Sequence, residues 1–191
     1  MTAIVPGDVL YYLSAPGASA GFATAGTVGD SWGNFMSTTP VSATALNNLF
    51  PDITGAENAA SQVDYACVFI LNNTASGNSM LNVVAWLPTA SDVAGGASVA
   101  LAADPTAASL KTASVAQALT IANSTTAPAG ISSWVTDVAS APTSPSYTGG
   151  VQLGTIAPGY CKAVWIRRTA ANTAPLNNDG FGLEVDFDTM G

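Results

Sequence analysis

The pattern of hydrophobic positions predicts short strands separated by turns. Strand-like segments bounded by Gly, Pro or Asn run over residues 8–14, 63–71, 80–87, 98–102, 115–122, 150–156, 160–169 and 181–188. Segment 63–71 is apolar on both faces, as expected of a central strand, whereas 181–188 alternates strictly between apolar and acidic positions. No segment has the length and period of a long amphipathic helix. The chain is therefore expected to be all-β, an antiparallel β-sandwich or a jelly-roll-like barrel.

Two short helical turns are the only helical structure that the sequence indicates. Ser42 or Thr44 could cap the first, which would bring Leu46, Leu49 and Phe50 together before Pro51 ends it. The second runs over residues 55–60. Both are too short to form the core of a helical protein.

Turn signals and burial also predict how the strands pair. Residues 80–87 follow 63–71 after a turn rich in Asn, Gly and Ser, so we expect these two segments to form a hairpin. For the two C-terminal strands, one register keeps the apolar face intact. Its pairs are Val164 with Val185, Ile166 with Leu183, and Trp165 with Glu184. That register sets Arg167 diagonal to the Glu184 carboxylate.

The N-terminal region 15–40 is rich in Gly, Ala, Ser and Thr and has the composition of an extended arm or a long loop. Trp32 and Phe35 are isolated aromatic anchors within it. Either they tuck back under a long loop, or they dock on a neighbouring subunit as hot-spot residues do. Because so few bulky groups offset the entropy of ordering this segment, we expect it to make contacts between subunits.

Length and composition favour one domain over residues 1–191. Residues 88–150 form a segment biased towards Ala, Ser and Thr inside that domain. Four Lys and Arg against twelve Asp and Glu give a net charge of −8, which disfavours binding to nucleic acid or to an anionic membrane surface. The N-terminus lacks a signal-peptide pattern, and no apolar run is long enough to span a bilayer. Cys67 and Cys161 are therefore expected to be buried thiols of a protein made in a reducing cytoplasm, and not a disulfide.

The absence of histidine excludes most enzymatic chemistry. Ser-His-Asp and Cys-His nucleophiles and His-containing zinc sites cannot form, and no phosphate-binding or dinucleotide-binding glycine motif is present. A Ser-Lys pair would need Lys111 or Lys162 buried beside a serine, and no sequence signal supports it. We therefore expect no enzymatic activity, no cofactor and no metal.

Three groups of charged or polar residues are candidate sites. They are the carboxylates Glu184, Asp186 and Asp188, the turn Asn177, Asn178 and Asp179, and the cations Lys162, Arg167 and Arg168. A carboxylate pair could hydrolyse glycosides, but alternate positions on a strand favour a solvated face. The Asn-Asn-Asp-Gly run could ligate calcium, but it is more typical of a turn. The cations favour a local ion-pair network over a phosphate site.

Six segments have distinctive sequences: Asp8–Ser14, Leu49–Glu57, Asp64–Thr74, Thr126–Gly130, Ala157–Thr169 and Asn178–Leu183. In these segments the chain resembles a group of tailed-bacteriophage virion proteins. These motifs are spread in order from residue 8 to residue 183, and they are structural, not catalytic. Where such proteins tend to have Tyr-Arg-Cys, this chain has Tyr65-Ala66-Cys67, so any role of that arginine is lost here.

The resemblance implies a virion structural protein, assembled in the host cytoplasm. The principal hypothesis is a capsid decoration (cement) protein that binds the outer shell, with the major capsid protein or other virion proteins as partners, and that forms homo-oligomers. One alternative is a tail or head-tail joining subunit. Another is a carbohydrate-binding module of a fibre, for which Trp134, Tyr147 and Trp165 are the plausible platform.

Overall fold

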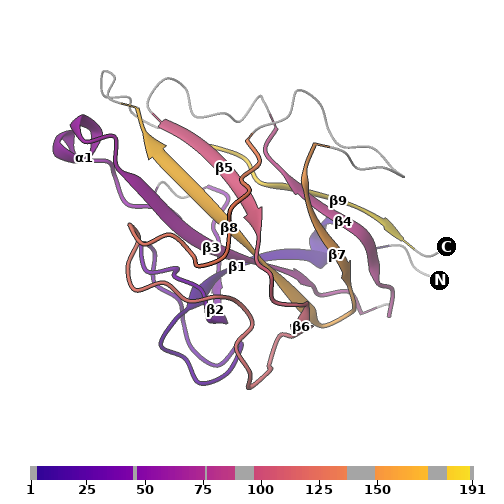
Figure 1. The fold of residues 1–191 in the computed structure, drawn as a ribbon. Coiled ribbons are helices and arrows are strands. Elements are labelled where there is room, and N and C mark those ends of the chain that lie inside the picture. The colour runs from indigo at the N-terminus through magenta and orange to yellow at the C-terminus, as the bar shows by residue number, and fades with distance from the viewer. Residues whose placement is uncertain are drawn as a thin grey trace.

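The computed structural model describes residues 4–44, 47–75, 77–88, 97–136, 149–171 and 180–189. They form two antiparallel sheets that pack on one another as a sandwich and do not close into a barrel (Figure 1). The strands are β1 (Val9–Ala15), β2 (Phe35–Pro40), β3 (Val63–Asn72), β4 (Met80–Trp86), β5 (Ala97–Ala103), β6 (Ser109–Leu110), β7 (Val151–Ile156), β8 (Tyr160–Ala170) and β9 (Glu184–Thr189). The all-β prediction is thus confirmed.

Helical structure among the described residues is limited to a 3-10 turn, η1 (Pro6–Asp8), and one helix, α1 (Gly55–Ala59). None of the described helices could cross a membrane. The helical turn predicted over residues 55–60 is confirmed by α1. The turn expected before Pro51 is not formed at residues 47–50, where Asn47 has a φ of 54°; residues 45 and 46 lie outside the described residues.

The large sheet has the order β2-β1-β3-β8-β5, with β6 pairing to the start of β8, and the small sheet has the order β7-β4-β9. β3 and β8 are central and pair over nine residues, from Val63 opposite Thr169 to Leu71 opposite Cys161. Both strands are buried on both faces. This explains why the sequence of β3 is a continuous apolar run.

Two cores lie on opposite faces of the large sheet. The inter-sheet core, between the two sheets, contains among others Leu13, Ala66, Val68, Ile70, Met80, Val83, Ala85, Leu101, Val164 and Ile166. The loop-covered core, on the other face, contains Met36, Cys67, Phe69, Leu71, Ala118, Ile121, Cys161, Ala163 and Trp165. Successive residues of β3 and β8 alternate between the two cores, as the period of a strand requires.

The predicted strand pairings at β4 and β9 are wrong. β4 does not form a hairpin with β3; it pairs with β7 and β9 in the small sheet. β8 does not pair with β9 either, because Val164 lies opposite Val68 and Ala103. Val185 lies opposite Ala85 instead. The alternating pattern determines which face of a strand is buried, but several neighbouring strands satisfy it equally well.

Two connections carry the chain from one sheet to the other, although the first was expected to be a hairpin turn within one sheet. Residues 73–79 lead from β3 to β4, and residues 157–159 lead from β7 to β8. They meet at Asn72, which is fully buried. Its Nδ2 donates hydrogen bonds to the carbonyl oxygens of Asn78 and Ile156, at 3.0 and 2.9 Å, and its own carbonyl accepts one from the N–H of Gly159. Hydrogen bonds from this one asparagine thus hold both connections between the sheets to the end of β3.

The region 15–40 is not a free arm. Its last six residues are β2, and the N–H of Phe22 donates to the carbonyl of Met36, so the preceding loop lies along the outer edge of β2. Gly33 has a φ of +88°, and a Cβ atom there would lie 1.9 Å from the carbonyl oxygen of Leu119. The small residues of this region therefore let its backbone pack closely against the backbone of residue 119 in the same chain.

Segment 88–150 contains β5 and β6, and much of its remaining described part is irregular. Residues 89–96 and 137–148 lie outside the described residues. The strand predicted over 98–102 is confirmed by β5, but the one over 115–122 is wrong. There the N–H groups of Gln117 and Ala118 both donate to the carbonyl of Asn34, so the segment bonds to the N-terminal loop and not to a sheet.

Candidate functional site

The carboxylates Glu184, Asp186 and Asp188 lie along β9, at an edge of the small sheet. Alternate residues of a strand are about 6.6 Å apart, so their side chains form a row and do not converge on one point. Among the described residues, no group of three or more His, Cys, Asp or Glu side chains is placed to hold a metal ion. The row forms an acidic face, but the solvated face expected from the sequence is found only in part: Glu184 is exposed, whereas Asp186 and Asp188 are half-buried.

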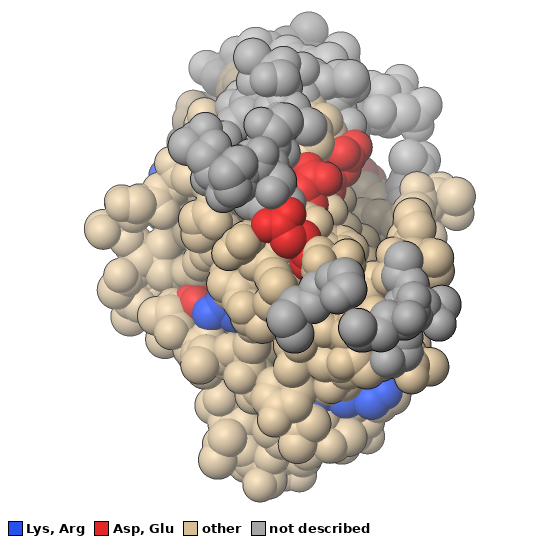
Figure 2. Space-filling view, turned by 90° about the vertical axis from the view of Figure 1, so that its right-hand side faces the viewer, with Lys and Arg blue, Asp and Glu red and all other residues tan. Residues whose placement is uncertain are grey.

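The charged residues of the small sheet are all acidic. β4, β7 and β9 contain these three carboxylates and no Lys or Arg. Figure 2 shows acidic side chains gathered on the side of the molecule where β9 lies, with the visible Lys and Arg atoms apart from them. The pKa of Tyr11 is raised to about 12, chiefly by burial and then by the charges of Glu184 and Asp186. The negative potential of this face is therefore not neutralised by cations of its own sheet.

Two polar atoms on the acidic face have no hydrogen-bond partner although they are buried. They are the indole Nε1 of Trp86 and the Oδ2 of Asp186. Trp86 lies directly opposite Glu184 in the pairing of β4 with β9, and its side chain is only 7% exposed. Asp186 lies opposite Val84 in the same pairing, so Trp86 and Asp186 are diagonal neighbours on one face of the sheet.

The three cations predicted to cluster are separated by the structure. The ion pair found among the described residues joins Arg168 to Asp64 of β3, at 2.8 Å. Arg167 points to the other face of β8 and lies 5.1 Å from the ring of Trp134. The predicted network therefore reduces to one ion pair, and its acid is Asp64 and not Glu184.

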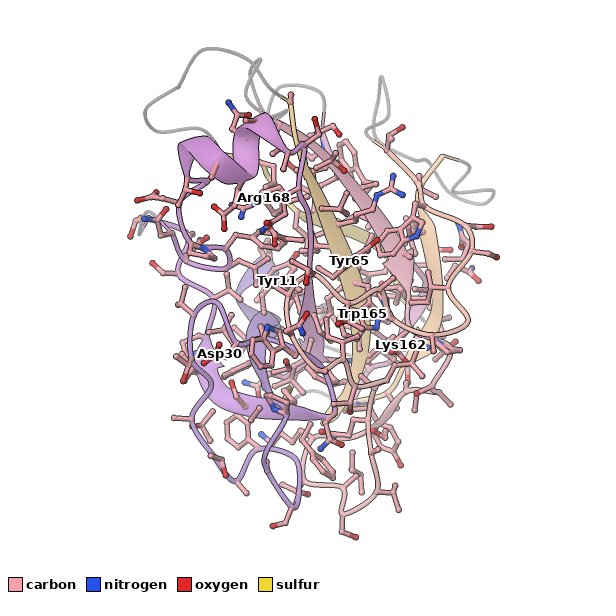
Figure 3. The ribbon with its side chains drawn as sticks, turned by 60° about the vertical axis from the view of Figure 1, so that its left-hand side comes forward. Tyr11, Asp30, Tyr65, Lys162, Trp165 and Arg168 are labelled. Atoms are coloured by element: carbon pink, nitrogen blue, oxygen red, sulfur yellow. The ribbon has the colours of Figure 1, made fainter. Side chains whose placement is uncertain are left out.

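The third cation, Lys162, lies on β8 with Trp165, and both are labelled in Figure 3. Lys162 and Trp165 belong to a buried polar network centred on Asp104. The Asp104 side chain accepts hydrogen bonds from the Trp165 indole at 2.7 Å and from the N–H groups of Leu119 and Thr106, both at 2.8 Å. Lys162 Nζ donates to the main-chain carbonyls of Asp104 and Thr106. Burial lowers the pKa of Lys162, and the charge of Asp104 opposes that shift. The network fastens the irregular segment after β5 to the large sheet.

Cys67 and Cys161 are buried and unbridged, in agreement with the expected thiols. They face the same core from adjacent strands, but Cys67 lies opposite Trp165 and Cys161 opposite Leu71. This four-residue offset separates them by about 13 Å along the strands, far beyond the reach of a disulfide.

We expect thiol labelling of the native protein to be slow and to become rapid only in denaturant. Burial raises the pKa of Cys67 well above its ordinary value and that of Cys161 to about 12, so neither thiolate is populated near neutral pH. Mass spectrometry after timed alkylation measures this. An intact-mass loss of two hydrogens that reductant reverses would contradict it.

The aromatic anchors of the N-terminal region pack within their own chain. Phe35 is 6% exposed, and Trp32 packs against the loop-covered core while its Nε1 donates to the carbonyl of Gly29 at 2.9 Å. Buried Ser31 adds a hydrogen bond to the carbonyl of Cys67. The expectation that Trp32 and Phe35 dock on a neighbouring subunit is therefore corrected, and the alternative of a loop tucked onto its own fold holds.

The carbohydrate platform proposed from the sequence is not assembled. Trp165 is fully buried in the loop-covered core. Trp134 is partly exposed, but its ring already has two partners. The ring centroid of Tyr65 lies 5.5 Å from that of Trp134, and the Arg167 guanidinium lies over the Trp134 ring. Tyr147 lies outside the described residues, as does the candidate calcium turn Asn177–Asp179.

A shallow groove of about 350 Å³ opens between β5 and β7. It is lined by small and apolar side chains, among them Ala102, Pro105, Ile131 and Val151. No Lys, Arg, Asp or Glu lines it, so it offers no chemistry for acid-base catalysis.

The organising role of Asp104 was not predicted from the sequence. The signal was present: Asp104 is a lone acid that directly follows the apolar segment 98–102 and Ala103, and it precedes Pro105. An isolated carboxylate in such a context is either exposed at a turn or buried with hydrogen-bond partners. The local sequence does not reveal the partners of Asp104, because Trp165 lies 61 residues away.

Comparisons with known proteins identify no relative. No protein-family model matches the chain, no curated protein is similar to it, and no solved structure matches its fold.

Proposed function

We propose that the protein is a structural component of a tailed-bacteriophage virion, and specifically a capsid decoration protein that binds the outer shell. The observation that carries the proposal is where the phage-like segments lie. Asp8–Ser14, Asp64–Thr74 and Ala157–Thr169 are distant in sequence, yet they contain most of β1, β3 and β8, the three adjacent strands at the centre of the large sheet. The resemblance therefore falls on one contiguous scaffold.

The use of the polar residues supports a structural role. The Asp104 network, Asn72 and the pair of Arg168 with Asp64 each fasten loops or crossings to the sandwich. The remaining acidic row is spread along a strand, where it suits contact with a partner surface more than catalysis. A net charge of −8 suits a component that should not compete for packaged DNA.

Fractionation of purified virions tests the proposal. A decoration protein should remain with DNA-filled heads after the tails have been detached, and purified chain should cosediment with heads that lack it. Recovery with the tail fraction would favour the alternative, a tail or head-tail joining subunit. Absence from purified particles would contradict a virion role.

A further inference from the structure

Two of the four large hydrophobic side chains that are exposed among the described residues lie in one turn, residues 110–117, the apolar turn. Leu110 is 50% exposed and Val115 is 69% exposed. Apart from Lys111 and Gln117, the other residues of this turn are Ala, Ser and Thr. Single exposed hydrophobic side chains are ordinary on a protein surface, whereas exposed hydrophobic side chains grouped in one place mark interaction sites.

Hydrogen bonds hold the apolar turn in a fixed conformation. Gln117 is buried, and its Nε2 donates to the carbonyl of Leu110 at 2.7 Å while its Oε1 accepts from the N–H of Met36 at 2.9 Å. The carbonyl of Ala113 accepts from the N–H of Gly21. The turn is thus fastened to β2 and to the loop before β2. A surface that is already ordered loses little conformational entropy on binding, so this turn is well suited to docking.

The surroundings of the apolar turn contain one positive charge. Lys111 is the only charged residue in the segment 105–136, and the segment 9–29 contains none. The Nζ of Lys111 lies 5.0 Å from the ring centroid of Phe22, and no acid among the described residues forms an ion pair with it. Charge complementarity therefore favours a partner surface that is apolar and has a carboxylate at its rim.

We propose that the apolar turn is the surface through which the protein binds the capsid shell. Leu110 and Val115 lie in an apolar pocket of the shell protein, and Lys111 lies beside a carboxylate at the rim of that pocket. The identity of the partner rests on the proposed function, whereas its chemistry follows from the turn. A second copy bound symmetrically through the same turn would bring two Lys111 ammonium groups together, which disfavours self-association there.

Cosedimentation with heads that lack the protein tests the two anchors. Leu110→Ala with Val115→Ala should weaken binding at least about tenfold, because a few buried anchors dominate the affinity of an interface. The matched control is Val5→Ala with Val28→Ala, which truncates exposed side chains elsewhere and should change binding less than about twofold. Urea unfolding should be nearly unchanged in both variants. No loss of binding in the first variant, or an equal loss in both, would overturn the proposal.

Substitutions of Lys111 test the chemistry of the partner. Lys111→Glu should weaken head binding, whereas Lys111→Arg should retain it. Binding of the unmodified chain should weaken as salt rises, and binding of Lys111→Gln should depend less on salt. Binding of Lys111→Glu that is as tight as that of the unmodified chain would show that no carboxylate lies beside this residue, and would overturn the proposal.

Two further outcomes separate this proposal from the proposed function. If the variant Leu110→Ala with Val115→Ala binds heads as well as the unmodified chain does, the decoration role stands and the proposal fails. If the unmodified chain binds no heads, the decoration role fails and the proposal fails with it. Sedimentation velocity of the chain alone tests for a second copy. Self-association that the same double variant abolishes would show that a second copy covers the turn, and would overturn the proposal.

Discussion

Replacing Asp104 with alanine should lower the free energy of unfolding by about 3–5 kcal/mol, the range for breaking a buried charged interaction. The carboxylate is 1% exposed and accepts three N–H donors. Its removal leaves the Trp165 indole and the Leu119 N–H without an acceptor, at a cost of about 1–3 kcal/mol each. The variant also leaves the buried Lys162 ammonium without a nearby negative charge.

Urea unfolding at neutral pH measures the effect. Asp30→Ala, at an exposed position, is the matched control and should change stability by less than about 0.5 kcal/mol. Trp165→Phe should lower the free energy of unfolding by about 1–2 kcal/mol, because it removes the hydrogen bond to the Asp104 carboxylate while an aromatic ring still packs in the core. A loss below about 1 kcal/mol for Asp104→Ala would show that the network does not fasten the loop.

The second large effect is a loss of stability above pH 9. Tyr11 and Cys161 keep their protons in the native protein up to about pH 12, whereas their ordinary pKa values are 10.0 and 9.0. Burial also raises the pKa of Cys67 well above its ordinary value. The native state therefore binds more protons than the unfolded state in this window, and the free energy of unfolding falls as pH rises.

One pKa unit corresponds to about 1.4 kcal/mol. By pH 12, the raised pKa of Cys161 should therefore lower the free energy of unfolding by an amount on the order of 4 kcal/mol, and that of Tyr11 by an amount on the order of 3 kcal/mol. Lys162 acts in the opposite direction, because its pKa is lowered in the native protein. Urea unfolding at a series of pH values measures the net slope. Tyr11→Phe should flatten the slope between pH 10 and 12, and stability that is flat or rising from pH 9 to 12 would contradict the account.

The faces of the strands could be predicted from the sequence, but their partners could not. In β1, Leu13 belongs to the inter-sheet core and Tyr12 packs on the loop-covered core, as the alternation of residues 8–14 indicated. The same alternation in residues 181–188 fits any neighbour with an apolar face, so it could not distinguish β4 from β8. Partner choice depends on contacts between distant segments, such as those of Asn72.

The candidate site was predicted in part. The acidic row on β9 follows directly from the positions of Glu184, Asp186 and Asp188. The position of β9 at an edge of the small sheet could not be predicted, because no local pattern encodes it. The region 15–40 was misinterpreted for a related reason: its glycines permit contact with the backbone of residues 111–119, which are distant in sequence.

Image reconstruction of the virion by electron cryomicroscopy would show directly whether the protein decorates the capsid. We expect density for the two-sheet sandwich at regular positions on the outer surface of the head. A complete reconstruction of head and tail in which no density fits the sandwich, from particles of a phage that expresses the chain, would contradict it.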